Sequence, residues 1–476
     1  MVRHTLSGPH LDLTVRGGTG GITAQLDDME AAARLIDNVS FELLGVAASC
    51  HGFLVSADLV ASAVLDPVGA ARFEAALLAA LDGPGGLTAT AGGVGLRAVQ
   101  LRAAVVAYRT ADDMAADLMQ VRRFLQGAVA LPVGLLAGAG WYAGEQLDGG
   151  DPAADLQRLL TDHPGIVDEV VGSAPGFVST LSSVLGPAVD GVFRFVTGKT
   201  LFPTTVAQGA GLLGLLYPDG RPVVKDLGID EGSTSMTRPP RSFDDIMSGL
   251  DYRNSQAQGQ IDVRIVERTM PNGSVRRSYI VDIPGTKDWQ LDPTGDRTYL
   301  NDLGTNLRVL SGDVTSYERG IEEALRRTGA KPGDAVMLVG HSQGGMVAVR
   351  AANDFVTNGK FNVTHVVTAG SPVAGMPVPR SVQLLSLENQ HDIVPHLDGQ
   401  DNPDAPNRTT VTFDQQLGSV GDNHSITGVK SPYRVAGKKL DDSVDPSVQA
   451  YRDSADTFFK GDRVSANAYN VARDTS

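Results

Sequence analysis

The sequence predicts an α/β domain with a mainly parallel sheet, preceded by a mostly α-helical N-terminal region. Three observations carry this prediction. Up to about Pro218, apolar residues recur at three- and four-residue spacing, which is the period of an α-helix. From Gln260 onward, short apolar runs of strand length alternate with helical patterns. Between these parts, residues 219–245 are polar and interrupted by glycine and proline, which is typical of a linker.

Composition limits the classes of protein and partner. The chain has 476 residues, 42% of them hydrophobic and 20% charged, so it has a globular composition and enough length for two or three domains. Its single cysteine, Cys50, excludes an intramolecular disulfide and a cysteine-rich zinc cluster. A formal net charge of -15 disfavours adhesion to nucleic acid. We therefore expect no nucleic-acid partner.

Residues 1–125 are expected to form a helical domain that contains a helical hairpin. Apolar residues at helical spacing mark three helices, at 25–48, 67–81 and 96–125. The turn "DGPGG" separates the second helix from the third, because glycine and proline end helices. The first residues lack the long apolar stretch of a secretory signal, so we expect a cytoplasmic protein or export by a route without a signal peptide.

Residues 126–218 are expected to form an apolar, glycine- and alanine-rich helical region. Within and just before it, residues 124–146 stay uncharged as far as Glu145, which is nearly the length of a bilayer-spanning helix. Small residues and Pro132 interrupt this stretch. Two interpretations stay open: contact with a membrane, or a buried helical segment.

Residues 246–476 are expected to form the α/β domain. Two alternating runs flank the turn "MPNGS", which predicts a β-hairpin. Helices and strands then alternate, which favours a parallel sheet. The further elements are helices near 313–327, 344–355 and 446–459, and strands at 335–340, 364–370 and 382–389.

One serine lies where a predicted strand turns into a predicted helix. The sequence "GHSQG" follows the strand "AVML", and its glycines Gly340 and Gly344 leave room for the sharp turn that exposes a nucleophile. The motif alone is weak in a glycine-rich chain, but this chain holds one copy, in the setting that the chemistry requires. We therefore predict that Ser342 is a nucleophile.

A serine nucleophile needs a general base and an acid that orients the base. In this type of fold the acid follows the serine and the histidine comes last. His424, on a late polar stretch, is the predicted base, since the histidines before it open a strand or crowd the acid region. Asp392 is the predicted acid, and Asp398 and Glu388 stay as alternatives.

The negative oxygen that forms during acyl transfer needs backbone donors. The amide of Gln343, directly after the nucleophile, is the first predicted donor, and the amide of Thr286, at a strand-ending Pro-Gly-Thr turn, is the second. The chemistry implies no cofactor and no metal. An acidic loop with Asp398, Asp401 and Asp404 is compatible with calcium, but a solvated loop is the simpler interpretation.

Together, "VMLVGHSQGG", "IPGT", "ENQHDIVP" and "NHSIT" resemble the α/β-hydrolase superfamily, and most of all its bacterial and fungal-type lipases and esterases. The resemblance covers about 260–459 and assigns Gly340, His341 and Gly344 to the turn around the nucleophile. It implies a serine hydrolase that cleaves carboxylic esters. The apolar glycine- and alanine-rich helices before the α/β domain suggest a lipid-like substrate. Gln343 and Pro284 depart from the lipase pattern, which commonly has Leu and Arg there.

The sequence "LRAAVVAYRTADD" is similar to the helical-hairpin substrates of type VII secretion, which carry a Tyr-x-x-x-Asp/Glu signal. Tyr108 and Asp112 fit that spacing, whereas the Trp-x-Gly turn of those substrates is replaced by "GPGG". The resemblance implies contact with a type VII secretion machinery. It also supports an alternative function, in which the helical half acts as a secreted interaction module or on membranes.

Overall fold

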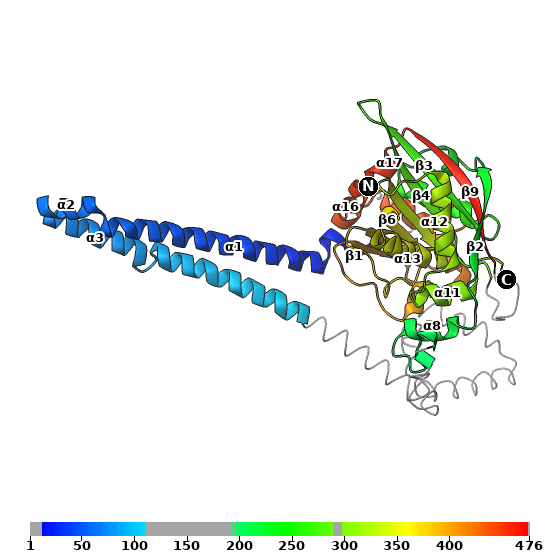
Figure 1. Cartoon of the computed structure of the whole chain (residues 1–476), viewed down its shortest axis with the longest axis horizontal. Coiled ribbons are helices and arrows are strands. Elements are labelled where there is room, and N and C mark those ends of the chain that lie inside the picture. The colour runs from blue at the N-terminus through cyan, green and yellow to red at the C-terminus, as the bar shows by residue number, and fades with distance from the viewer. Residues whose placement is uncertain (1–11, 111–170, 172–192, 195, 289–297, 475–476) are drawn as a thin grey trace, which may run out of the picture. The chain divides into compact units, whose positions relative to one another are not determined.

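The computed structural model describes residues 12–110, 171, 193–194, 196–288 and 298–474. Their contacts divide the chain into two units (Figure 1). One unit comprises residues 22–119, and the other combines residues 1–21 with 120–476. The fold class predicted from the sequence is confirmed: a helical N-terminal region accompanies an α/β domain.

The first unit is helical throughout its regular elements. Helix α1 (Ile22–His51) continues into the short 3₁₀ turn η2 (Gly52–Val55), and α2 (Ala57–Leu65), α3 (Pro67–Asp82) and a helix at residues 87–110 follow. Side chains cap two of these starts: Ser56 accepts a hydrogen bond from the amide of Leu59, and Asp66 accepts one from Gly69. The helices expected at 25–48 and 67–81 are present, as is the described part, up to residue 110, of the one expected at 96–125, and the "GPGG" turn separates α3 from the last one.

The second unit is built on one sheet of nine strands. Their order is β1-β8-β7-β6-β5-β4-β3-β9-β2. Neighbours from β4 to β8 run parallel, whereas β1, β3, β9 and β2 pair antiparallel with their neighbours. The strands are β1 (Leu13–Gly17), β2 (Arg221–Ile229), β3 (Gln260–Thr269), β4 (Val275–Ile283), β5 (Ala335–His341), β6 (Asn362–Ala369), β7 (Gln383–Asn389), β8 (Arg408–Phe413) and β9 (Arg463–Asp474).

Helices cover both faces of the sheet (Figure 1). On one face lie α12 (Ser316–Thr328) and α13 (Gln343–Thr357), next to α11 (Leu303–Leu310), which in turn carries α8 (Val206–Gly214). On the other face lie α10 (Phe243–Asn254), α15 (Pro432–Leu440), α16 (Pro446–Ser454) and α17 (Asp456–Phe459). The short helix α9 (Thr234–Thr237) contacts β9.

Burial on both faces explains the sequence of the central strands. Residues Val336 to Val339 of β5 are fully buried, so this strand is apolar without alternation, as strands in the middle of a parallel sheet are. Helix α12 has a different pattern, because only one of its sides meets the sheet. Its Tyr317, Ile321 and Leu325 are buried at helical spacing.

The sheet also recruits segments outside the range expected for it. Strand β1 belongs to the residues 1–125 for which a helical domain is predicted, and it pairs with β8. Strand β2 lies in the expected linker at 219–245 and forms the opposite edge of the sheet. Edge strands are exposed along much of their length, and seven of the nine residues of β2 are exposed. Such a strand lacks the apolar run by which buried strands are recognised.

Two sequence-based expectations lie outside the described residues. These are the apolar stretch at 124–146 and Asp112 of the predicted secretion signal. Most of the expected 126–218 region lies there as well. Tyr108 itself is described, and it lies exposed near the end of the helix at 87–110.

Candidate active site

Ser342 occupies a strained turn between β5 and α13. Its backbone angles are φ 55° and ψ -123°, and among the described residues it is the one non-glycine residue with positive φ. Both neighbouring glycines are required by space. A Cβ added to Gly340 would lie 2.2 Å from the carbonyl carbon of Gly344, and one added to Gly344 would lie 2.0 Å from the carbonyl oxygen of Ile283. The strand, the turn and the helix therefore agree with the predicted setting for a nucleophile.

The structure brings His424 and Asp392 together. His424 is the last residue of the short helix α14 (Val420–His424), and Asp392 follows β7. The His424 Nδ1 lies 2.6 Å from Asp392 Oδ2. A carboxylate accepts hydrogen bonds, so Nδ1 carries the proton and Nε2 of a neutral His424 keeps its lone pair. That is the tautomer in which the ring can accept a proton at Nε2.

Asp392 is completely buried and accepts three hydrogen bonds. Besides His424, the Tyr433 hydroxyl donates to Oδ2 over 2.5 Å and the amide of Val394 donates to Oδ1 over 2.9 Å. Burial and the neighbouring Asp392 carboxyl raise the pKa of Tyr433 well above its usual value, so the phenol stays protonated and keeps donating. These bonds fix the carboxylate in one orientation.

His341, the residue before Ser342, packs against the His424 ring. The rings of His341 and His424 pack with their centroids 4.5 Å apart and their planes 32° apart. The His341 Nε2 donates a 2.8 Å hydrogen bond to the carbonyl oxygen of His424, which requires the proton on Nε2. Burial holds the pKa of His341 well below its usual value, so this ring is neutral. His341 thus positions the loop of His424 without adding a charge.

No hydrogen bond joins the side chains of Ser342 and His424 within the described residues. The Ser342 amide donates to the carbonyl oxygen of Ala369 over 2.9 Å, and a Cβ added to the next residue, Gly370, would lie 3.0 Å from His424 Cε1. Ser342 is 3% exposed, and the His424 side chain is 16% exposed. Contacts between a nucleophile and its base are often loose before substrate binds and tighten in the complex. The backbone of Ser342 and the ring of His424 therefore both lie beside residues 369–370.

The two predicted backbone donors lie on either side of the serine. Gln343 begins α13, and its amide donates to no acceptor among the described residues, as expected at the start of a helix. The amide of Thr286 is likewise without an acceptor there. Between them, Gly285 approaches the nucleophile closely: a Cβ added to Gly285 would lie 2.9 Å from the Ser342 Cβ. Glycine is therefore needed at this point of close approach.

Three asparagines hold the loop that carries Thr286. The Asn301 side chain donates to the carbonyl oxygen of Gly285 over 3.0 Å, and Asn254 accepts from the amide of Gly285 over 3.2 Å. Asn306, on α11, bonds the Thr286 hydroxyl over 3.0 Å. The loop is thus tied to α10, to the segment before α11, and to α11 itself.

The other candidate acids lie elsewhere. Asp398 accepts a 2.7 Å hydrogen bond from the amide of Ala374, and Glu388 accepts a 2.5 Å bond from the Asn402 side chain. Asp398 is also 6% exposed, so it does not belong to a solvated loop as expected. His391 pairs with an exposed aspartate, and the buried His365 bonds Ser454. None of these groups contacts His424.

Sequence reasoning did not find Tyr433, Gly370 and Asn389. Tyr433 lies on α15, and nothing in its local sequence marks it as a partner of Asp392. Gly370 follows β6 with φ 60°, and a Cβ there would lie 2.8 Å from both Asp392 Oδ2 and the Tyr433 hydroxyl. The Asn389 side chain donates to the carbonyl oxygens of Gln415 and Asn423, which ties the Asp392 loop to the start of the His424 loop. Of these three residues, Gly370 is the one that the sequence marks, because a glycine at the end of a predicted parallel strand indicates a point of close approach.

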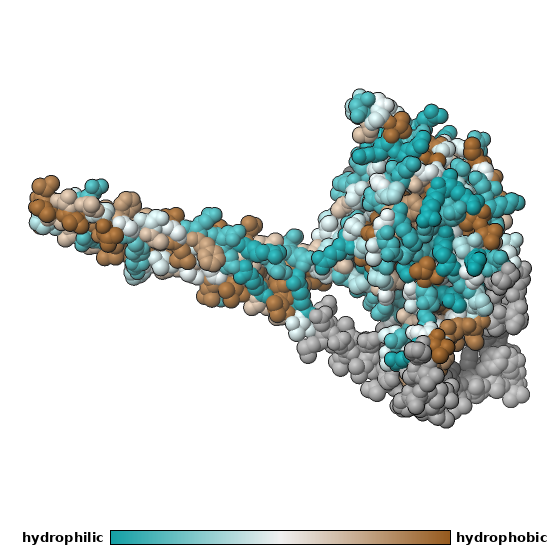
Figure 2. Space-filling model, in the orientation of Figure 1, coloured by the Kyte–Doolittle hydropathy of each residue, from teal (hydrophilic) through white to brown (hydrophobic). Residues whose placement is uncertain are grey.

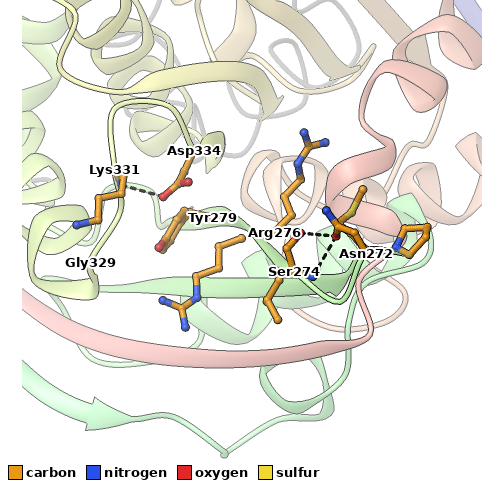
Figure 3. Close-up of a pocket in the computed structure, with 11 residues that line it drawn as sticks. Asn272, Ser274, Arg276, Tyr279, Gly329, Lys331 and Asp334 are labelled. Carbon is orange, nitrogen blue, oxygen red and sulfur yellow. Dashed lines mark hydrogen bonds between the residues drawn. The ribbon is translucent and has the colours of Figure 1, made fainter.

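A separate surface pocket lies at the opposite end of the sheet. It is lined by residues of the β3–β4 turn and of the loop that enters β5 (Figure 3). Its hydrogen bonds are local: Asn272 accepts from the amide and hydroxyl of Ser274, and Asp334 accepts from the amide of Lys331. Ser342 follows the other end of β5, so this pocket does not contain the reacting groups.

The sequence of this domain was compared with known families. Residues 308–439 match the PGAP1-like alpha/beta domain. The matched range of this PGAP1-like domain includes Ser342, Asp392, His424 and Tyr433, whereas Thr286 precedes it. The match supports the α/β-hydrolase superfamily for the C-terminal part of the chain, and with it a hydrolase in general. No curated protein and no solved structure matches the chain.

Proposed function

We propose that the protein is a serine hydrolase that cleaves carboxylic esters through a covalent acyl-enzyme. In this proposal Ser342 is the nucleophile, His424 the general base and Asp392 the group that orients His424. The observation that carries the proposal is the 2.6 Å bond between His424 Nδ1 and Asp392 Oδ2, on a ring packed against the residue before Ser342. It leaves Nε2 as the basic nitrogen next to a serine in a nucleophile turn.

The first half of the reaction forms the acyl-enzyme. Ser342 Oγ bonds to the ester carbonyl carbon as its proton passes to His424 Nε2. The carbonyl oxygen gains the negative charge and accepts hydrogen bonds from the amides of Gln343 and Thr286. The intermediate then expels the alkoxide, which takes the proton from His424 and leaves as the alcohol. Asp392 remains ionised and stabilises the positive His424 between these transfers.

The second half returns the enzyme. Water gives a proton to His424 Nε2 and bonds to the acyl carbon, so that the charge again forms on the oxygen between the Gln343 and Thr286 amides. Collapse of this intermediate breaks the bond to Ser342 Oγ, which takes the proton from His424. The products are the carboxylic acid and the free enzyme. No cofactor or metal is part of this scheme.

We further propose a lipid-like acyl group. Helix α8 is apolar, and its neighbourhood exposes Leu213 and Leu216 at 53% and 59%. It packs on α11, the helix whose Asn306 bonds the Thr286 hydroxyl. An apolar surface therefore lies one helix away from the predicted oxyanion site, which supports an apolar substrate.

A fluorophosphonate probe tests the nucleophile, because only an activated serine reacts with it. We expect labelling of the full chain at pH about 8, loss of labelling in Ser342→Ala, and unchanged labelling in Ser443→Ala, a matched change on a surface loop. An absence of labelling between pH about 6 and about 9 in the folded protein would overturn the proposal.

Esters of p-nitrophenol with graded acyl chains test the substrate class. We expect kcat/KM to rise with chain length and turnover to increase when the substrate passes its micelle transition. A preference for acetyl esters, with no change at that transition, would retain the serine hydrolase but reject the lipid-like substrate.

A further inference from the structure

The helical unit buries small side chains where its helices meet. Its buried positions recur every seven residues on α1 and on the helix at 87–110, and Ser40 donates a 2.9 Å hydrogen bond to the carbonyl oxygen of Ala91. A Cβ added to Gly95 would lie 2.9 Å from the Ser40 Oγ, so the two backbones approach closely. We call these positions the seam: Leu26, Ala33, Ser40, Ala47, Ala91, Ala98 and Val105.

Large apolar side chains lie on the outside of the same helices. Val39, Phe41 and Val46 of α1 are exposed at 48%, 71% and 53%. At 100° per residue, Val39 and Val46 fall on one side of the seam and Phe41 falls on the other. The outer surface is therefore apolar on both sides of the seam. Figure 2 shows brown, hydrophobic spheres along the face of this unit that is in view.

This distribution is the reverse of a water-soluble helical hairpin, which buries its large apolar residues between the helices. Helices in lipid pack differently, because the surrounding acyl chains already solvate large apolar groups. Their contacts are made by Gly, Ala and Ser, which allow close approach. The outer surface and the middle of the seam, with Ala33, Ser40, Ala47, Ala91 and Ala98, follow the membrane pattern, whereas Leu26 and Val105 at the ends of the seam are large.

A belt without unpaired charge crosses the middle of this unit. It comprises residues 43–57 and 75–96. Apart from His51 and Asp82, these two ranges contain no Asp, Glu, Lys, Arg or His. These two pair with each other, His51 Nε2 to Asp82 Oδ2 at 2.8 Å. The contact between His51 and Asp82 joins the two parts of the belt, and the contact between Ser40, which precedes the belt, and Ala91 joins α1 to the helix at 87–110.

The dimensions of the belt fit a bilayer. As continuous helix, 15 residues span about 22 Å and 22 residues about 33 Å, against a hydrocarbon thickness of about 30 Å, and the turn at 83–86 interrupts the second part. The described segment Ile22–Val55 is long and apolar enough to cross a membrane by length and composition, and 11% of its most apolar window is buried. Charged residues flank each part in the sequence: Glu42 and Asp58 flank the first part, and Glu74 and Arg97 flank the second.

We propose that the helical unit inserts into a lipid bilayer as a hairpin, with this belt in the hydrocarbon core. A second copy of the chain or a rigid protein partner would cover one side of the hairpin. Lipid covers all sides, which matches exposed apolar residues on both sides of the seam. The paired His51 and Asp82 satisfy each other where no water is available.

Cys50 allows a direct test, since it is the single cysteine and lies in the belt. A polarity-sensitive maleimide dye on Cys50 of the full chain is mixed with phosphatidylcholine vesicles, with and without phosphatidylglycerol, and also reconstituted by detergent dialysis. We expect a blue shift of emission, quenching by lipids brominated on the acyl chains, and little dependence on salt. The dye at Cys50→Ser/Val444→Cys, on an exposed loop of the α/β domain, should show neither effect.

A dye at Cys50→Ser/Val46→Cys repeats the measurement at a second belt position.

Matched variants then test which residues of the helical unit lie in the bilayer. Val46→Asp should weaken vesicle binding by about 10²-fold, since an aspartate in the core of a bilayer is costly, whereas Leu35→Asp, exposed outside the belt, should weaken it far less. Circular dichroism checks that both variants keep their helices.

Three results would overturn the proposal. The first is unchanged emission with every vesicle and after reconstitution. The second is a blue shift without lipid that rises with protein concentration together with a doubled mass, which would mean that a second copy covers the hairpin. The third is equal loss of binding in Val46→Asp and Leu35→Asp. Because ester hydrolysis is not measured, each result is independent of the proposed catalytic function.

Discussion

Asp392 illustrates how a single carboxylate is oriented by more than its contact with one histidine, His424. Its Oδ2 accepts from both His424 and Tyr433, and its Oδ1 accepts from the amide of Val394. The carboxylate therefore has one favourable rotamer in a fully buried position. Removing any one of the three donors would change the orientation of the Asp392 carboxylate or weaken the stabilisation of its negative charge.

Asp392→Asn tests the orienting role. An asparagine presents an NH₂ group or a carbonyl oxygen to Nδ1 and no longer favours the tautomer with a basic Nε2, so kcat should fall by up to about 10⁴-fold. Tyr433→Phe should give a smaller loss, because His424 keeps its carboxylate. Steady-state kinetics at equal folded fraction measures both.

Asp398→Asn is the matched control. The asparagine side chain keeps an oxygen for the amide of Ala374, so turnover should stay near that of the original protein, with a loss of stability of about 1 kcal/mol. If Asp398→Asn or Glu388→Gln abolishes turnover while Asp392→Asn does not, the acid has been assigned to the wrong residue.

Glu318 gives the fold a predictable pH dependence. This residue of α12 is 1% exposed, and burial raises its pKa to about 8. Between the pKa of an unfolded glutamate and about 8, the folded state holds a proton that the unfolded state has lost, so stability falls as the pH rises through this window. Below the window both states are protonated and the stabilisation is complete.

Glu318→Gln is neutral at every pH and should remove this contribution. We expect the fall in Tm between pH 5 and pH 8.5 to be smaller in Glu318→Gln than in the original protein. Thermal unfolding followed by circular dichroism at both pH values measures the difference. A fall of equal size in the two proteins would assign the pH dependence to other buried carboxyls.

At the scale of elements, the nucleophile turn depends on its contact with the end of β4. Gly285→Ala would place a methyl group 2.9 Å from the Ser342 Cβ and should displace either the serine or the Thr286 amide, with a large loss of kcat. Gly333→Ala is a matched control before β5, where the added group meets no atom within 4 Å. Hydrolysis rates and melting temperatures of the two variants separate a local effect from unfolding.

At this scale, the elements that could be predicted were those whose signals lie next to one another in the sequence. The β5–Ser342–α13 unit was predictable because a buried apolar strand, a glycine-flanked serine and an amphipathic helix are contiguous. Strands β1, β2, β8 and β9 were not recognised. For β9 the residues "SANAYN" are small or polar, and pairing with β3 and β2 makes the strand. Tyr433 was missed for the same reason, since its contact with Asp392 depends on tertiary packing.

At the scale of the whole molecule, the helical unit and the α/β unit each have their own buried contacts. A change in the seam should therefore lower the stability of the helices without affecting hydrolysis. Ser40→Leu overfills the seam beside Gly95 and should cost about 1–3 kcal/mol in helix stability. Cleavage of a short soluble ester should be unchanged.

Ser49→Leu adds the same side chain at an exposed position of α1 and should leave the melting temperature of the helices unchanged. Helical circular dichroism during heating and initial rates of ester cleavage are the two measurements. Loss of cleavage in Ser40→Leu, but not in Ser49→Leu, would mean that the units depend on each other.

The pairing of β1 with β8 sets an order of events during synthesis. Leu13 pairs with Phe413, so β1 is synthesised about 400 residues before its partner strand β8. Contacts with so large a sequence separation form slowly, and the whole helical unit can fold before β8 exists. In the meantime β1 is a free strand that other nascent chains could capture. Its exposed Arg16 and Thr14 alternate with its apolar residues, and a charge on an edge strand discourages such pairing until β8 arrives.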